Sequence, residues 1–158
     1  MAQMTDTSIK INAPINEVYS FISNMENMVY FWDKIKSVEK DPNNLSAVGP
    51  GSKYFIIFNT VLGGKKRIEL ELTNSVAHEK FEYRDNSNSL HVLTGYNFSE
   101  EQDGVLVTIY RKTELGPIAN LLSFNAVSSR DSKKELENVL SNLKRFLEVE
   151  PAINENQS

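Results

Sequence analysis

Cysteine is absent from this chain of 158 residues. Without thiols the chain forms no disulfide, binds no metal through a thiolate and has no cysteine nucleophile. The two histidines, His78 and His91, stand in none of the spacings by which histidines bind zinc. We therefore expect neither a metal site nor a cofactor. A cysteine-free chain is also compatible with the cytoplasmic location that we expect.

An excess of positive charge and long apolar runs are missing too. The chain has 17 basic and 21 acidic residues, a net charge of −4, which disfavours nucleic acid as the main partner. No apolar run approaches the ~20 residues that span a bilayer, and residues 1–6 do not have the pattern of a signal peptide. We expect a single domain over residues 1–150, followed by a flexible polar tail over residues 151–158.

The last third of the chain carries the strongest periodic pattern. Over residues 128–150 the apolar positions recur at spacings of three and four, which predicts one long helix with a wide apolar face. These positions are Leu136, Val139, Leu140, Leu143, Phe146 and Leu147. A face of this width needs a large apolar surface to cover it.

Most of the preceding chain alternates with a period of two, as strands do. The predicted strands cover residues 7–12, 35–39, 54–60, 67–72, 76–84, 90–98 and 105–114. Gly63-Gly64 predicts a hairpin. Two short helices are predicted at residues 14–23 and 25–32, and an interrupted helix at 118–127, with Asn125 and Ser128-Ser129 allowing a bend.

This order of elements predicts an α+β fold. Because short hairpins can join neighbouring strands, the sheet should be antiparallel, and a sheet of this length twists and curls. We expect six to seven strands wrapped around the long C-terminal helix, with two short helices after the first strand.

Several local motifs resemble one family. They are the opening INAPINEVYSFI at residues 11–22, the aromatic pair Phe31-Trp32, Gly49-Pro50-Gly51-Ser52 before the meander, Asp103-Gly104 before the last strand, and the terminal helix. Over residues 7–149 the chain is similar to the START/Bet v 1-like (SRPBCC) superfamily of helix-grip proteins, close to its polyketide cyclase/dehydrase and lipid-transport group. The resemblance implies an internal cavity between sheet and helix that holds an apolar molecule, and it implies no reaction.

Aromatic side chains are the candidates for lining such a cavity. A pocket for a small hydrophobic ligand is mainly apolar with a few placed hydroxyls, whereas the alternative is an ordinary filled core. We predict ligand contacts from Trp32, Tyr54, Phe58, Tyr83, Tyr96 and Arg111. Arg111 is included as an anchor for a ligand carboxylate because it shares a strand face with apolar residues. A one-residue slip in register would reverse each strand assignment.

Three classes of function stay open. The favoured one is a carrier or sensor of a small hydrophobic ligand. The second is a cyclase or dehydratase in which Arg111, a tyrosine and His91 polarise a carbonyl group, which requires titratable groups to converge. The third is an accessory module that docks on a protein through a sheet edge or the terminal helix, which requires an exposed apolar patch. The sequence does not determine an oligomeric state.

Two charged clusters have simple interpretations. Glu69 and Glu71 lie on one strand face, and we expect that face to be solvated. Lys65-Lys66-Arg67 forms a basic cluster at a predicted hairpin tip, where solvation, an acidic partner and lipid headgroups are the alternatives.

Overall fold

The computed structural model describes the backbone of residues 2–43, 49–60, 62–87, 91–114 and 124–157. Within these ranges it also describes the side chains, apart from those of residues 2–3, 114, 124–131 and 149–157. The elements, in chain order, are β1 (Ala2–Ile11), α1 (Ile15–Ser23), the 3-10 turn η1 (Met25–Asn27), α2 (Met28–Phe31), β2 (Ile35–Lys40), β3 (Lys53–Asn59), β4 (Lys65–Val76), β5 (Lys80–Asp85), β6 (Val92–Glu101), β7 (Gly104–Glu114) and α4 (Phe124–Gln157).

The strands form one antiparallel sheet in the order β1-β7-β6-β5-β4-β3-β2. The predicted α+β fold is confirmed. Five neighbouring pairs are consecutive in the chain, as short connections require. The sixth pair differs from the expectation of hairpins throughout, because β1 pairs with β7, from Ala2↔Glu114 to Ile11↔Val105. The first and last strands therefore lie side by side.

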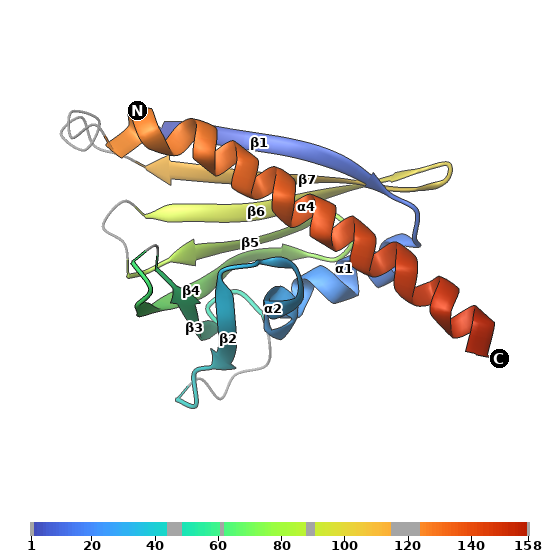
Figure 1. Cartoon of the computed structure of the whole chain (residues 1–158), viewed down its shortest axis with the longest axis horizontal. Helices are drawn as coiled ribbons and strands as arrows, with labels where there is room; N and C mark the ends of the chain where they lie inside the picture. The colour runs from blue at the N-terminus through green and yellow to red at the C-terminus, as the bar shows by residue number, and fades with distance from the viewer. Residues whose placement is uncertain (1, 44–48, 61, 88–90, 115–123, 158) are drawn as a thin grey trace.

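Helix α4 lies across the inner face of the curved sheet, over β1, β7 and β6 (Figure 1). It contacts β1, β7 and α2. Five of the six apolar positions predicted on this helix are buried: Leu136, Val139, Leu140, Leu143 and Leu147. The sixth, Phe146, is half-buried and stacks on Phe21 with 4.8 Å between ring centroids. Covering this apolar face stabilises the fold by roughly 1.5–3 kcal/mol for each large side chain removed from water.

The opposite side of the core comes from alternate residues of the strands. Val105, Val107 and Ile109 of β7 have no exposed surface, and Leu70 and Leu72 of β4 are buried as their alternation predicts. Their neighbours in the sequence point to the outer face. The period of two therefore predicts correctly which face of the sheet is covered.

Several element boundaries differ from the predictions, including those of α4, β5 and β1. Helix α4 runs without interruption from Phe124, so the predicted bend at Asn125 and Ser128-Ser129 is wrong. Strand β5 begins at Lys80 rather than residue 76, because a turn with His78 at a φ of 66° comes first. Strand β1 begins at Ala2, earlier than predicted.

Parts of two predictions are not settled by the described residues. Residues 118–123 of the predicted helix at 118–127 lie outside them. Helix α4 continues through Gln157, and the flexibility expected after residue 150 stays a prediction.

Candidate functional site

One row of residues crosses the inner face of the sheet from β4 to β1. Cross-strand pairing aligns Leu72 with Tyr83, Tyr83 with Thr94, Thr94 with Arg111, and Arg111 with Thr5. Directly paired side chains on one face lie about 5 Å apart at their Cβ atoms. Tyr83 and Arg111 are therefore separated only by Thr94, which is a buried polar residue.

Tyr96 lies two residues beyond Thr94 on β6 and joins this row to α2. Its hydroxyl accepts a hydrogen bond from Trp32 Nε1 at 3.2 Å, and Tyr83 lies close enough for the two tyrosines to affect each other's pKa. All three side chains are buried, with 1% of Tyr96, 4% of Tyr83 and 8% of Trp32 exposed. The fold thus places three polar groups close together inside an apolar core.

Burial decides the protonation of the two tyrosines. It raises the pKa of Tyr83 well above its ordinary value, and the neighbouring Tyr96 raises it further. Burial also raises the pKa of Tyr96 to about 12, against smaller lowering effects from Trp32, Tyr83 and Arg111. Near neutral pH both groups are uncharged hydroxyls.

Arg111 points from β7 toward α4. Its guanidinium group lies 2.8 Å from Glu135 Oε1 and donates to Ser132 Oγ at 3.1 Å. It also lies 5.7 Å from the centre of the Trp32 ring. Lys34 Nζ is 3.6 Å from the second oxygen of Glu135. A ligand carboxylate would therefore compete with Glu135 for Arg111.

Tyr54 and Phe58 occupy another part of the inner face. Both lie on β3, which β4 separates from Tyr83. Tyr54 is buried, and burial together with the charge of Glu26 raises its pKa. Phe58 is half-buried and pairs with Ile35 of β2. The structure thus gathers four of the six predicted residues, and a role in ligand binding stays a prediction for all six.

Sequence reasoning missed three members of the cluster: Thr94, Ser132 and Glu135. Thr94 could have been found from the period of two, because it precedes Tyr96 by two residues. Ser132 and Glu135 stand four residues before Leu136 and Val139 respectively, so helical spacing places them beside the apolar face. Polar residues in such flanking positions resemble surface residues until their partners on the sheet are known.

The remaining candidates lie on the outside of the molecule. His91 is exposed and immediately precedes β6, with a φ of 47°. Glu69 and Glu71 accept hydrogen bonds from Asn86 Nδ2 at 2.9 and 3.0 Å. Within the described ranges, no group of three or more histidine, aspartate or glutamate side chains could hold a metal ion. No helix among the described residues is long and apolar enough to cross a membrane.

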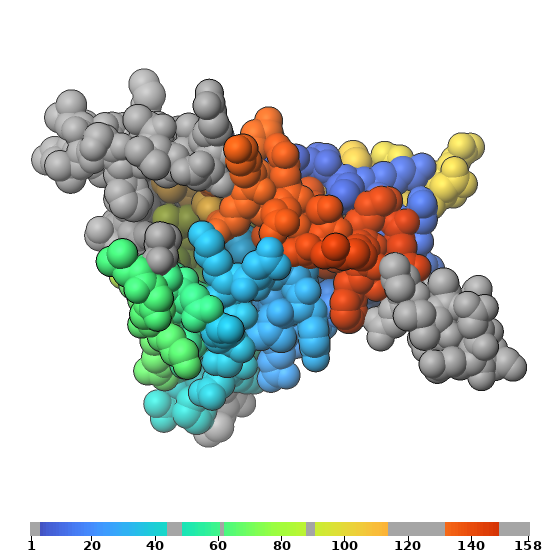
Figure 2. Space-filling view, viewed as in Figure 1, coloured from blue at the N-terminus to red at the C-terminus, as the bar shows by residue number. Residues whose placement is uncertain are grey.

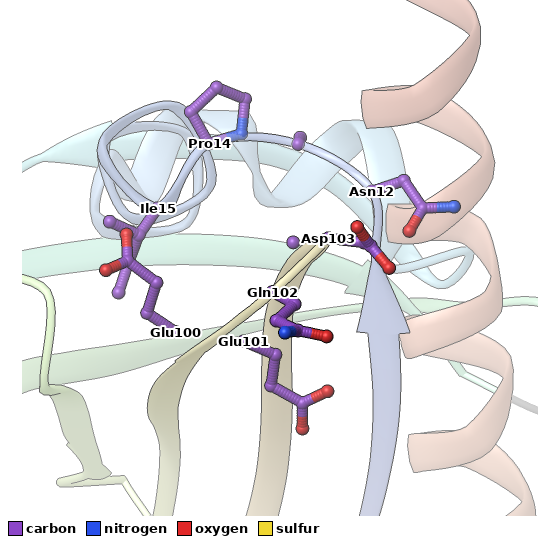
Figure 3. A pocket seen from close by; sticks show the side chains of 9 residues that line it. Asn12, Pro14, Ile15, Glu100, Glu101, Gln102 and Asp103 are labelled. Atoms are coloured by element: carbon purple, nitrogen blue, oxygen red, sulfur yellow. The ribbon is translucent and has the colours of Figure 1, made fainter.

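An open pocket of about 530 Å³ lies at a different place, between the start of α1 and the turn from β6 to β7. Figure 3 shows Asn12 and Pro14 on one side and the β6–β7 turn with Asp103 on the other. Glu100 and Glu101 add two more carboxylates to its lining, and none of the six predicted residues belongs to it. An apolar ligand would gain little from this surface.

Comparison with known families agrees with the fold. The family described as polyketide cyclase / dehydrase and lipid transport matches residues 2–148. The chain belongs to this family. Its fold and family place it in the START/Bet v 1-like superfamily, as the sequence motifs indicate. A search of curated proteins found no match.

Solved structures of low identity share the fold. The di-domain ARO/CYC StfQ from the steffimycin biosynthetic pathway is 10% identical, with a TM-score of 0.76 over 96% of this chain and 53% of StfQ. This chain therefore spans about half the length of StfQ. The protein TTHA0849 from Thermus thermophilus is 17% identical, with a TM-score of 0.71 over 93% of this chain and 98% of its own. Ara h 8.0201 is 9% identical, with a TM-score of 0.67 over 93% and 98% of the two chains.

Proposed function

We propose that the protein binds a small hydrophobic ligand, a lipid or a polyketide-like molecule, between the inner face of the sheet and α4. The observation that carries this proposal is the buried polar cluster of Trp32, Tyr83 and Tyr96, in which Trp32 donates a hydrogen bond to Tyr96. A core that only stabilises the fold gains little from buried hydroxyls, whereas ligand sites combine apolar walls with a few placed polar groups. Membership of a family described by cyclase, dehydrase and lipid-transport functions supports the same class of function.

The cluster also favours one kind of polar group on the ligand. The oxygen of Tyr96 accepts a hydrogen bond from Trp32, so the proton of Tyr96 can be donated to a ligand oxygen. A carbonyl or hydroxyl oxygen could accept it without displacing a protein group. A carboxylate bound at Arg111 would have to replace Glu135, which is 2.8 Å away. We therefore expect a ligand with a neutral oxygen near one end.

A cyclase or dehydratase activity is the second candidate. The gathering of Tyr83, Tyr96 and Arg111 favours it, because hydroxyl and guanidinium donors can stabilise negative charge on a carbonyl oxygen. The high pKa values of both tyrosines disfavour them as bases near neutral pH. Glu135, which is paired with Arg111 and Lys34, is then the carboxylate that belongs to the cluster. His91 is exposed and immediately precedes β6.

Ligand binding is tested by native mass spectrometry of protein purified from cells and by thermal shift with fatty acids and aromatic polyketide-like ketones. The proposal expects a bound small molecule or a rise in Tm for at least one compound. Tyr96→Phe should weaken that effect, and Tyr30→Phe at an exposed site should not. No bound species, together with no shift across the panel, would contradict binding. A panel compound recovered with a changed mass would favour the enzyme instead.

A further inference from the structure

The hairpin between β3 and β4 exposes an apolar side chain at its tip. Leu62 is 98% exposed, more than any other large hydrophobic residue that the structure describes. The turn around it is fixed by hydrogen bonds from Thr60 N to Gly64 O at 2.8 Å and from Gly63 N to Thr60 O at 3.1 Å. Gly63 has a φ of 86°, which suits glycine. Leu62 is therefore exposed to solvent beside Gly63 and Gly64, whose backbones bond to Thr60.

Basic side chains surround this tip. Lys65, Lys66 and Arg67 follow Leu62 in the chain and are all exposed. Lys34 and Lys36 lie beside them, because Asn59 N donates to Lys34 O at 2.9 Å where β2 and β3 meet. Among these five residues, Lys34 has a carboxylate partner in Glu135, and Arg67 lies over the Phe55 ring at 3.8 Å. In a chain of net charge −4, this is a local positive surface.

We propose that the β3–β4 tip is a peripheral docking site for a membrane surface that contains anionic lipids. Leu62 would enter the boundary between headgroups and acyl chains, while Lys65, Lys66 and the adjacent basic residues contact the phosphates. This combination of an apolar group with basic neighbours is what reversible attachment to a membrane requires. The proposal does not depend on a ligand inside the fold.

The shape of the tip favours a membrane over an acidic protein. The hairpin lies at one edge of the molecule (Figure 2, green). A stable protein interface buries about 800 Å² on each partner, which needs a broader surface than one hairpin turn. A single side chain can insert into a lipid surface without a complementary pocket.

Co-sedimentation with vesicles tests the proposal. The full chain is mixed with vesicles of phosphatidylcholine and phosphatidylglycerol, and with vesicles of phosphatidylcholine alone. We expect binding to the anionic vesicles only, and a loss of binding in ~1 M salt, where the screening length falls to about 3 Å. Lys65→Gln/Lys66→Gln should weaken binding by about fivefold for each lysine, and Leu62→Asp by about tenfold or more.

Matched controls come from the other end of the strands. Strand register places Lys10, Val76 and Lys80 at the end away from the β3–β4 tip. Lys10→Gln/Lys80→Gln makes the same change in net charge as Lys65→Gln/Lys66→Gln. Val76→Ser removes an exposed apolar side chain, as Leu62→Asp does. Both control variants should bind the vesicles like the unaltered protein. Three results would overturn the proposal. The first is equal binding to both kinds of vesicle, and the second is an equal loss of binding in the tip variants and the control variants. The third is binding to polyglutamate without binding to either kind of vesicle. Circular dichroism verifies that each variant is folded.

Discussion

Tyr96 connects the helical and sheet sides of the inner cluster. It accepts a hydrogen bond from Trp32 at 3.2 Å, and it has only 1% of its surface exposed. Tyr96→Phe would leave the buried Nε1 donor of Trp32 without its acceptor, at a cost of about 1–3 kcal/mol in the free energy of unfolding near neutral pH. Urea denaturation measures this loss. The exposed control Tyr30→Phe should change the stability by less than about 0.5 kcal/mol.

The same tyrosine makes stability depend on pH in the alkaline range. Its pKa is raised from 10.0 to about 12 in the folded protein, so the folded state holds the proton more tightly than the unfolded state. Its contribution is therefore complete below pH 10 and is lost as the pH rises to about 12, by up to roughly 1.4 kcal/mol per pH unit. Across this range the free energy of unfolding should fall less with rising pH for Tyr96→Phe than for the unaltered protein. Equal pH dependence of the two proteins would show that Tyr96 is not the group responsible.

Gly95 is required by the outer face of the sheet. A Cβ atom at this position would lie 2.3 Å from Cζ of Tyr110, whose ring crosses β6. The Tyr110 hydroxyl donates to Glu82 Oε2 at 2.5 Å, and burial followed by this bond raises the pKa of Tyr110. Gly95→Ala should displace the ring, lower stability by about 1–3 kcal/mol, and move the pKa of Tyr110 down toward its ordinary value.

Urea denaturation and an absorbance titration of tyrosine measure these two effects. The control is Gly49→Ala, because nothing lies within 4 Å of a Cβ atom at Gly49. Equal stability of Gly95→Ala and the unaltered protein would mean that the ring moves aside without cost.

At the level of elements, α4 is fastened by polar contacts as well as by its apolar face. Asp33, just after α2, accepts hydrogen bonds from Asn138 Nδ2 at 2.5 Å and Asn142 Nδ2 at 3.0 Å. Asn142 Nδ2 also donates to Phe31 O at 3.2 Å. These contacts fix α4 to the segment that carries Trp32, so they position one wall of the proposed site.

Removing Asp33 should loosen α4 without unfolding the sheet. Asp33→Ala removes the acceptor of Asn138 Nδ2 and one of the two acceptors of Asn142 Nδ2 at an exposed site, which costs about 1 kcal/mol. Amide hydrogen exchange in residues 132–148 should become faster, while exchange in β5 and β6 stays unchanged. The control is Glu137→Ala, an exposed position on the same helix. Uniform changes in both regions would show that Asp33 supports the whole fold instead.

Element prediction succeeded where a buried face imposes a period on the sequence. The alternation around Leu70 and the three-four spacing around Leu140 identified a strand and a helix with their buried sides. The pattern failed for residues 2–6 of β1, which are mostly polar and become a strand because they pair with the end of β7. Pairing between the first and last strands is a long-range contact, and local periodicity carries no information about it.

The candidate site was predictable only in part for the same reason. Tyr83, Tyr96 and Arg111 were identifiable because each shares a strand face with apolar residues. Their contacts with Trp32 and Glu135 arise from the packing of α2 and α4 on the sheet. The ion pair between Arg111 and Glu135, at 2.8 Å, follows from this packing. The sequence pattern did not predict it.

Across the whole molecule, the basic β3–β4 tip and the carboxylates around the β6–β7 turn lie at opposite ends of the sheet, and Lys10 offsets part of the acidic charge at 3.9 Å from Glu101 and from Asp103. Lys65 and Lys66 lie at one end, while Glu100, Glu101 and Asp103 line the pocket at the other. The register of β4, β5 and β6 fixes this separation, since it places the start of β4 and the end of β6 at opposite ends. A membrane containing anionic lipids would therefore attract the β3–β4 end and repel the β6–β7 end, which orients the molecule.

The central claim is that the cluster around Tyr96 binds a small hydrophobic ligand. Trp32 is the only tryptophan in the chain and bonds directly to Tyr96, so its fluorescence reports on this site alone. The measurement is a fluorescence titration of the protein with fatty acids and polyketide-like ketones, repeated with Tyr96→Phe. We predict a saturable change in Trp32 emission with at least one ligand, and weaker binding in the variant. The absence of a saturable change with every ligand would contradict the claim.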